Sequence, residues 1–298
     1  MPAHKPNRKR TLCLLACFLA ALFFLGALYH YIGPEDPVAP FGQIAVHFID
    51  VGQGDATLIE AQGRFMLIDG GERGNEQTII NYLQNLGVRR IDYVIASHPH
   101  SDHIGGLAHG VIDAFPIGTI IAPRFSPENV PTTRVYERFL EAVARAVEQG
   151  TQARYSAVGE TIALGNAQVT ILGPLREYPG INNNSIILRL DYGETSALFT
   201  GDAERTAERE LADTYGHRLR VCVLHAGHHG SNTSSNAEFL YYVAPRYVVI
   251  PVGVYNSFGH PDPRAMERIR ATNAIIYRTD IDGTVVMRSD GLTFWRNS

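Results

Sequence analysis

The residues with the most chemical potential gather at positions 98 to 103, where the chain reads His-Pro-His-Ser-Asp-His. Imidazole nitrogens and carboxylate oxygens, with no cysteine beside them, are ligands that suit Zn(II), with Mn(II) and Fe(II) as less favoured alternatives. Further groups of the same kind follow at Gly201-Asp202 and at Gly227-His228-His229. Together they supply what a site with two metal ions needs, which indicates a metal-dependent hydrolase.

The sequence around this cluster predicts how its side chains are directed. In an extended segment alternate residues face one side, so His98, His100 and Asp102 should project together. A turn is then needed to bring His103 round. We expect Asp102 to cap a helix that opens at residues 104–106, whose two glycines would let the backbone pass close beneath bound ions.

Apolar periodicity and turn residues predict the elements that must position these groups. We expect strands at residues 44–50, 56–61, 64–69, 93–96, 169–172, 186–191, 196–200, 220–224, 247–251, 274–278, 284–288 and 292–295. We expect helices at residues 76–86, 133–149, 203–214, 237–243 and 263–271. Residues 278–283 should form a hairpin turn. The chemical motifs all fall just after strands, where packed α/β architectures place their sites.

The N-terminus differs from the rest of the chain. Residues 1–10 form a basic leader, and residues 11–32 contain no acidic or basic residue except His30. A run of about 20 apolar residues can cross a bilayer, so an uncleaved signal anchor is favoured over a cleaved signal, which would yield a secreted form. Basic residues stay on the cytoplasmic side, so the part that follows the linker of residues 33–41 should be extracytoplasmic.

Charge and cysteine content limit the function classes. The formal charge of the chain is −4, and it becomes −8 without the four basic residues of the leader. A broadly basic surface for nucleic acid is therefore not expected. Two of the three cysteines lie in the apolar segment, which leaves Cys222 alone. The domain at residues 42–298 must therefore be stabilised by its core and by metals rather than by disulfides.

Beyond the histidine cluster, several motifs occur in a fixed order. They are Asp50-Val-Gly-Gln-Gly-Asp55, Leu67-Ile-Asp-Gly-Gly71, Asn182-Asn-Asn-Ser185, Thr200-Gly-Asp-Ala-Glu204, Gly227-His-His-Gly-Ser231 and Gly259-His-Pro261. From Gly42 to the C-terminus, the chain resembles the metallo-β-lactamase fold superfamily, and most closely the extracytoplasmic hydrolase domain of ComEC-type DNA-uptake proteins. The resemblance implies an α/β fold, a four-layer αββα sandwich, here preceded by one transmembrane helix.

The resemblance also implies roles for individual residues. His98 and His100 would hold one of two divalent ions, Asp102 and His103 the other, and Asp202 would bridge both. His229 is the favoured further ligand of the second ion, with His228 as a phosphate contact. The expected second-shell residues are Asp69, Asp50, Asp55 and Asn183. Asp69 would orient the histidine loop, whereas the residues from Asp50 to Asp55 could equally form only a tight hairpin turn.

The sequence departs from the superfamily pattern at two places. Many members have another histidine between the cluster and the bridging acid, and here that region offers only asparagines, including Asn183. Either His260 completes the first ion's ligands, or water does and this ion binds more weakly. The second departure is Asp202 where many true β-lactamases carry cysteine, which favours phosphoester hydrolysis over lactam opening.

These features favour a membrane-anchored, extracytoplasmic phosphodiesterase, a ComEC-like nuclease acting on DNA through a metal-activated hydroxide. Asp102, Asp202, His228 and His260 are the candidate catalytic residues. A chain with one apolar segment cannot itself be a DNA channel, so a separate protein would have to supply one. Alternatives are a hydrolase of cell-wall phosphoesters such as teichoic acid or phosphorylcholine, a non-catalytic protein that binds phosphate through its metals and, as a minor possibility, a β-lactamase.

Overall fold

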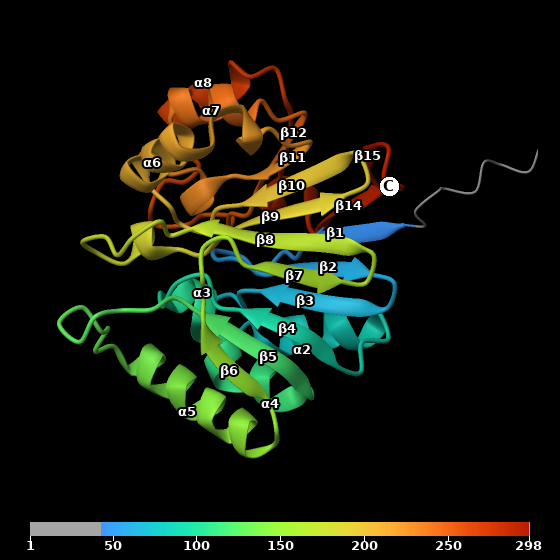
Figure 1. The fold of residues 1–298 in the computed structure, drawn as a ribbon, viewed down its shortest axis with the longest axis vertical. Helices are drawn as coiled ribbons and strands as arrows, with labels where there is room; N and C mark the ends of the chain where they lie inside the picture. The colour runs from blue at the N-terminus through green and yellow to red at the C-terminus, as the bar shows by residue number, and fades with distance from the viewer. Residues whose placement is uncertain (1–42, 298) are drawn as a thin grey trace, which may run out of the picture. The chain divides into compact units, whose positions relative to one another are not determined.

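The computed structural model describes residues 43–297, and this part of the chain folds around two β-sheets with helices on both outer sides (Figure 1). The first sheet holds eight strands in the order β15 (Phe294–Arg296), β14 (Val285–Ser289), β1 (Ile44–Phe48), β2 (Thr57–Ala61), β3 (Arg64–Ile68), β4 (Ile91–Ile95), β5 (Ile117–Ala122) and β6 (Gln152–Tyr155). The second holds seven, in the order β13 (Ile275–Arg278), β12 (Tyr247–Ile250), β11 (Val223–His225), β10 (Thr195–Phe199), β9 (Ile187–Tyr192), β8 (Ala167–Gly173) and β7 (Thr161–Leu164).

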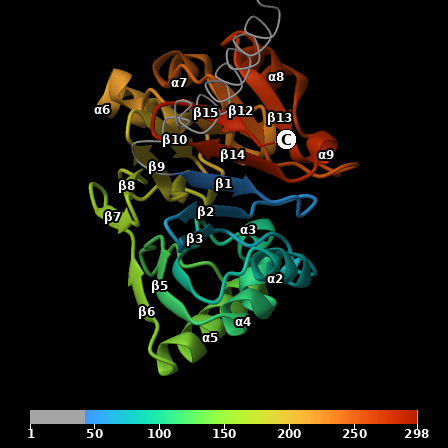
Figure 2. The same cartoon turned by 90° about the vertical axis from the view of Figure 1, so that its right-hand side faces the viewer.

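One group of helices covers each sheet, as the turned view shows (Figure 2). The first sheet is covered by α2 (Glu76–Asn85), α3 (Ser101–Gly106), a π-helical turn (Leu107–Val111), α4 (Ile112–Ala114) and α5 (Arg134–Glu148). The second is covered by α6 (Arg205–Tyr215), α7 (Ala237–Val243) and α8 (Pro263–Arg270). A short helix, α9 (Thr279–Asp282), leads from one sheet to the other.

Three apolar clusters hold these layers together. One lies between the sheets and contains residues of both, such as Phe48, Val249 and Phe199. The other two lie between each sheet and its helices, with Leu67 and Leu224 as buried examples. Strands with apolar side chains on both faces belong in a sheet covered on both sides. The expected four-layer αββα sandwich is therefore present.

The strand directions bring the chemical motifs to one edge. Strands β3, β4, β5 and β6 pair in parallel, and so do β10, β11, β12 and β13. Carboxyl ends of parallel strands meet at the same edge of a sheet, where α/β proteins bind their ligands. The histidine cluster follows β4, Asp202 follows β10 and His229 follows β11. The loop between β1 and β2 lies at the same edge, because it carries Asp55, which is grouped with His103, Asp202 and His229.

Three strands escaped the sequence analysis. The exposed strand β6 lacks an apolar face, β7 alternates over only four residues, and β5 is a short apolar run without strong turn signals on either side. Their absence from the prediction left residues 117–164 with too little sheet. The order and bounds of the other elements agree with the prediction to within a few residues, which is ordinary for element ends.

Two local predictions were wrong. Helix α3 begins at Ser101, with His100 at its N-cap position, so Asp102 lies inside the helix and does not cap it. Residues 278–283 form no hairpin, because β13 and β14 belong to different sheets and α9 connects them. In addition, a side chain at position 106 would come within 2.1 Å of the Gly70 carbonyl oxygen. The glycines of α3 thus permit close helix packing rather than passage beneath an ion.

Among the described residues, no helix combines the length and apolar character that a membrane span requires. The expected anchor at residues 11–32 lies outside the described residues, as do the leader and most of the linker.

Candidate metal centre

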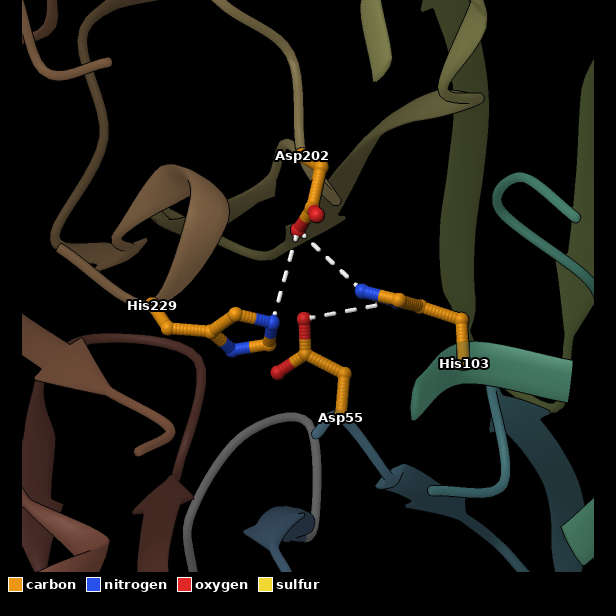
Figure 3. A group of neighbouring side chains, drawn as sticks. All are labelled: Asp55, His103, Asp202 and His229. Carbon is orange, nitrogen blue, oxygen red and sulfur yellow. Dashed lines mark ion pairs between the residues drawn. The ribbon is translucent and has the colours of Figure 1, made fainter. Parts of the chain in front are cut away.

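Four segments from both halves of the fold, one of them a helix, contribute to one cluster of acids and histidines. Asp55 comes from the β1–β2 loop, His103 from α3, Asp202 from the turn after β10, and His229 from the turn after β11. Their side chains point toward a common centre (Figure 3). One ligand-capable atom of each lies within 4.8 Å of those of the others, and all four residues are buried. This group has the composition of a divalent metal site.

Distances within this group centre on one oxygen of Asp202. Its Oδ1 lies 3.1 Å from His103 Nε2 and 3.7 Å from His229 Nε2. Asp102 lies at the margin, because its Oδ2 is 3.1 Å from His229 Nε2 but 4.0 Å from His103 Nε2. The start of α3 at Ser101 places Asp102 there, on the first turn of the helix.

A second group of possible ligands shares Asp202. It consists of His98, His100 and Asp202, whose ligand atoms again lie within 4.8 Å of one another. His98 Nε2 is 3.5 Å from Asp202 Oδ2, the carboxylate oxygen that does not face His103. The family resemblance implied a bridging role for Asp202, and Asp202 belongs to both groups here, although Asp55 rather than Asp102 accompanies His103.

Buried polar atoms that form ion pairs but no hydrogen bond support the assignment of the cluster to a metal site. Asp55 Oδ2, His103 Nε2 and Asp202 Oδ1 are buried, and none of them has a hydrogen-bond partner among the described residues. Buried polar atoms almost always have one, so three such atoms that face each other need an explanation. A bound cation would use all three as ligands, so the residues present fit a divalent metal ion.

Asp69 fixes the orientation of His103. Its Oδ2 accepts hydrogen bonds from Ser97 Oγ at 2.6 Å and from His103 Nδ1 at 2.7 Å, and its Oδ1 accepts one from the Ser97 amide. With Nδ1 held in this way, His103 Nε2 is directed at Asp202. A carboxylate behind a histidine commonly orients metal ligands and raises their basicity.

Asp55 lies closer to the centre than the second-shell position expected from sequence. One of its oxygens, Oδ1, is 2.9 Å from His225 Nε2, which leaves Oδ2 facing the cluster. The sequence analysis missed His225 because it lies within the buried end of β11 and belongs to no motif. Its contact with Asp55 across the two halves could not be read from spacing.

The protonation of the cluster reflects its burial and charge. Burial by itself would raise the pKa of Asp202, but the charges of His103, His229 and His98 together outweigh it and hold this pKa well below the usual range. Burial would likewise lower the pKa of His229, but the carboxylates of Asp202, Asp102 and Asp55 together outweigh it and raise the pKa to about 9. Protons on the histidines thus balance the carboxylates, and a metal cation would displace them.

His228 lies beside Asp202, the residue that both ligand groups share. Both His228 and His229 adopt left-handed backbone conformations, which separate neighbouring side chains in a tight turn. His228 Nε2 lies 3.5 Å from Asp202 Oδ2, and its Nδ1 lies 3.5 Å from Glu204 Oε1 and 3.3 Å from Thr233 Oγ1. This ring is therefore oriented by Glu204 and Thr233, which the sequence analysis did not single out.

The cluster opens into a pocket of about 240 Å³. Its lining residues are Gln53, His100, Ser101, Asp102, Asp202, His228, His229, Phe258 and His260. The His260 ring lies 5.6 Å from that of His228, so His260 is at the pocket wall. His260 is in neither ligand group, which leaves the group of His98, His100 and Asp202 with three protein ligands among the described residues.

Two expected second-shell residues are placed elsewhere. Asp50 is exposed, and its Oδ1 accepts the Gly52 amide, which is the turn contact considered from sequence. Asn183 Oδ1 accepts the amides of Glu204 and Ala207 at the start of α6. It therefore holds the helix that follows Asp202 and does not contact a ligand.

Comparisons with known proteins agree with this geometry. Residues 49–254 match the family model described as the metallo-beta-lactamase superfamily. Among solved structures, the metallo-beta-lactamase fold protein YhfI from Bacillus subtilis has a TM-score of 0.53 at 12% identity, and covers 86% of this chain and 100% of its own. A variant of the CmlA beta-hydroxylase has a TM-score of 0.52 at 14% identity, with 85% of this chain and 54% of its own covered. At these identities the likeness concerns the fold alone.

The curated relatives of this chain include a protein named for competence and one named for recombination. "Competence protein ComA" of Neisseria gonorrhoeae is 33% identical over 86% of this chain and 34% of its own length. "ComE operon protein 3" of Bacillus subtilis is 27% identical over 82% of this chain and 33% of its own, and "Recombination protein 2" of Haemophilus influenzae is 32% identical over 80% and 28%. The chain thus spans about a third of the length of these relatives.

Proposed function

Because the chain belongs to the metallo-β-lactamase superfamily, we propose that it is a metal-dependent phosphodiesterase that cleaves DNA. The observation that carries this proposal is the sharing of Asp202 between two groups of metal ligands at the base of one pocket. A pair of neighbouring divalent ions suits in-line displacement at phosphorus. The choice of DNA is supported by the competence proteins among the relatives.

The residues divide between two ions. His98, His100 and Asp202 would hold the first, and three protein ligands leave a position open, as in catalytic sites. The second would be held by the four residues of Figure 3, with Asp102 at the margin. Divalent ions, Zn(II) in preference to Mn(II), would supply Lewis acidity and a lowered pKa for water at the phosphate.

Two histidines of the pocket wall, His228 and His260, would contact the phosphate and transfer protons. Burial would lower the pKa of His228, but the carboxylates of Glu204 and Asp202 together outweigh it and raise this pKa, so the ring can donate to a phosphoryl oxygen or to the leaving oxygen. Burial lowers the pKa of His260, and its Nδ1 has no partner among the described residues. His260 is therefore suited to accept a proton.

The test follows end-labelled single- and double-stranded DNA with the full chain after reconstitution with Zn(II) or Mn(II). Metal-dependent cleavage that is lost in Asp102→Ala and Asp202→Ala is expected. Asp50→Ala is the matched control, since this aspartate is exposed and its carboxylate accepts a hydrogen bond from the Gly52 amide of its own turn. Metal-loaded protein that leaves every DNA intact would overturn the nuclease assignment.

A second candidate substrate follows from the extent of the match. Since the chain spans about a third of its curated relatives, the activity of the whole relatives does not transfer directly. A phosphoester of a cell-wall polymer, such as teichoic acid or phosphorylcholine, would suit the same metal pair. Release of wall phosphate without DNA cleavage would favour this candidate, and phosphate binding without any turnover would favour a binding role.

We further propose that residues 11–32 anchor the chain in the cell membrane, with the metal centre outside and any DNA channel supplied by a separate protein. The support is the apolar run behind four basic residues. Cell fractionation and protease treatment of intact spheroplasts test it. We expect the protein in the membrane fraction, with its metal-centre domain digested by protease added outside intact spheroplasts. Full-length protein in the soluble fraction would contradict the proposed anchor.

A further inference from the structure

Exposed apolar side chains stand on the loop that joins β12 to α8, and one of them lines the metal pocket. Tyr255 is 100% exposed and Phe258 is 66% exposed, and Val254 is exposed between them and the sheet. Phe258 also lines the pocket together with His228 and His260. Large exposed aromatic groups beside a polar site are candidates for ligand contact, because their exposure to water stabilises nothing in the folded chain.

The loop is ordered by its own hydrogen bonds. Asn256 Nδ2 donates to the carbonyl oxygens of Gly253 and His260, and Asn256 Oδ1 accepts the His260 amide. Gly253 donates to Gln53 Oε1 on the loop that carries Asp55. The aromatic side chains therefore project from a fixed loop attached to the metal site, and their exposure does not come from a poorly packed segment.

A row of rings connects Phe258 with the metal centre. The Phe258 ring is nearly parallel to that of His260, at 18° and 5.9 Å between centroids. His260 in turn lies edge-on to His228 at 5.6 Å, and His228 Nε2 is 3.5 Å from Asp202. His260 thus stacks beside Phe258, and 66% of the Phe258 side chain remains exposed, where a planar ligand could contact it.

We propose that Phe258 stacks on an unpaired nucleobase next to the scissile phosphate, so that the centre selects single-stranded nucleic acid. This inference rests on the proposed function and narrows its substrate. Stacking on an aromatic side chain accepts every base, as a non-specific nuclease requires. Bases within a duplex are stacked on each other and cannot reach the ring without being flipped out.

The depth of the centre supports the same selection. Asp202 and His229 are buried and line a pocket of only about 240 Å³, and His103, which does not line it, is buried as well. A phosphate must enter this pocket to meet the ligands. The flexible backbone of a single strand can bend into it, whereas a duplex, stiff over about 150 base pairs, presents its phosphates on a convex surface.

The test compares Phe258→Ala with Tyr241→Ala in the metal-loaded full chain. Tyr241 is 67% exposed on α7 and lines no part of the metal pocket, so it is the matched control. Three substrates are used: a single-stranded oligonucleotide, its duplex, and an oligonucleotide without bases around the cleavage site. For Phe258→Ala we expect kcat/KM on the single strand to fall about 5- to 100-fold. Cleavage of the base-free substrate should stay unchanged, and Phe258→Trp should restore the activity.

Other outcomes overturn the inference in distinguishable ways. Equal losses on the single strand and the base-free substrate would mean that Phe258 supports the metal centre rather than a base. Unchanged cleavage of the single strand, or faster cleavage of the duplex by wild type, would remove the proposed selection. If wild type cleaves none of the three, the proposed function fails. The stacking is then judged by quenching of a 2-aminopurine strand, which Phe258→Ala should abolish and whose persistence would refute it.

Discussion

Asp202 is the residue on which both ligand groups depend. Its Oδ1 faces His103 and His229, and its Oδ2 faces His98 and His228. No other carboxylate among the described residues belongs to both groups. Loss of this side chain should therefore disturb two ions at once, unlike loss of a residue that belongs to one group.

The first prediction concerns the substitution Asp202→Ala. We expect the metal content to fall from two ions to fewer than one per chain. Cleavage should fall by more than the roughly 10- to 100-fold that follows loss of an outer hydrogen-bond partner of a ligand. Metal analysis of the dialysed protein and the DNA assay measure the two effects. Two retained ions would show that Asp202 is not the bridge.

The second prediction concerns Asp69, which acts through His103. Asp69→Asn keeps the size of the side chain but removes the charge and one acceptor from the contacts to Ser97 and His103. Metal affinity should drop about 10- to 100-fold, with cleavage recovering when metal is supplied in excess. Metal titration checks the affinity. A loss of kcat that excess metal does not restore would contradict a positioning role.

Single residues differ in how far sequence could place them. The types and spacing of His98, His100 and His103, followed by Asp202, were sufficient to predict a shared centre, because each follows a strand end. Asp55 and His225 were not predictable as a pair, since they are 170 positions apart and meet only when the halves pack. Phe258 belongs to no ligand motif, so only its exposure beside the pocket reveals it.

At the scale of elements, helix α6 follows the bridging aspartate and carries a buried acid of its own. Glu208 accepts the amides of Ser235 and Asn236 and the side-chain amide of Asn236, and so ties α6 to the loop before α7. Burial raises the pKa of Glu208 to about 7, because desolvation outweighs these hydrogen bonds. Helix α6 is thus held by the Glu208 carboxyl group, whose protonated form is favoured in the folded state.

The third prediction follows from the sign of this shift. The folded pKa lies above the unfolded value of 4.5, so the contribution of Glu208 is complete below pH 4.5 and is lost as pH rises through about 7. The loss amounts to about 3 kcal/mol in the free energy of unfolding. Urea unfolding of metal-free protein between pH 5 and pH 8 measures it. In Glu208→Gln this pH dependence should flatten, and an unchanged slope would contradict the assignment.

Elements were easier to predict from sequence than the contacts between them. Most strands and helices follow from their apolar periodicity, as in α5, whose buried residues Phe139, Ala142 and Ala146 lie on one face. The start of α3 was misplaced because Asp102 has the type of a capping residue, whereas the backbone becomes helical already at Ser101. The edge strand β6 has no apolar face, and the alternation in the edge strand β7 extends over only four residues, so neither could be distinguished from a loop.

At the scale of the whole molecule, the metal centre joins the two halves of the sandwich. Asp55 and His103 belong to the half built on the first sheet, and Asp202 and His229 to the half built on the second. Without metal, Asp202 forms ion pairs with His103 and His229. The atoms Asp55 Oδ2, His103 Nε2 and Asp202 Oδ1 then have no hydrogen-bond partner among the described residues. A cation at this point would replace those contacts with bonds that cross between the halves.

The last prediction is that metal removal loosens the whole domain rather than the pocket alone. Ligands that bind only the folded state stabilise it by about 2.7 kcal/mol at 100 times Kd, which corresponds to several degrees in Tm for a domain of this size. Treatment with EDTA should therefore lower Tm, and added Zn(II) or Mn(II) should restore it in wild type and in Asp50→Ala. Asp202→Ala should not respond to metal, because it lacks the carboxylate that both ligand groups share. Calorimetry measures these shifts.

A Tm that EDTA leaves unchanged in a protein shown to have lost its metal would mean that sheet packing alone holds the halves together. The ion pairs would then be sufficient for the fold, and the metal would serve only the chemistry of the pocket.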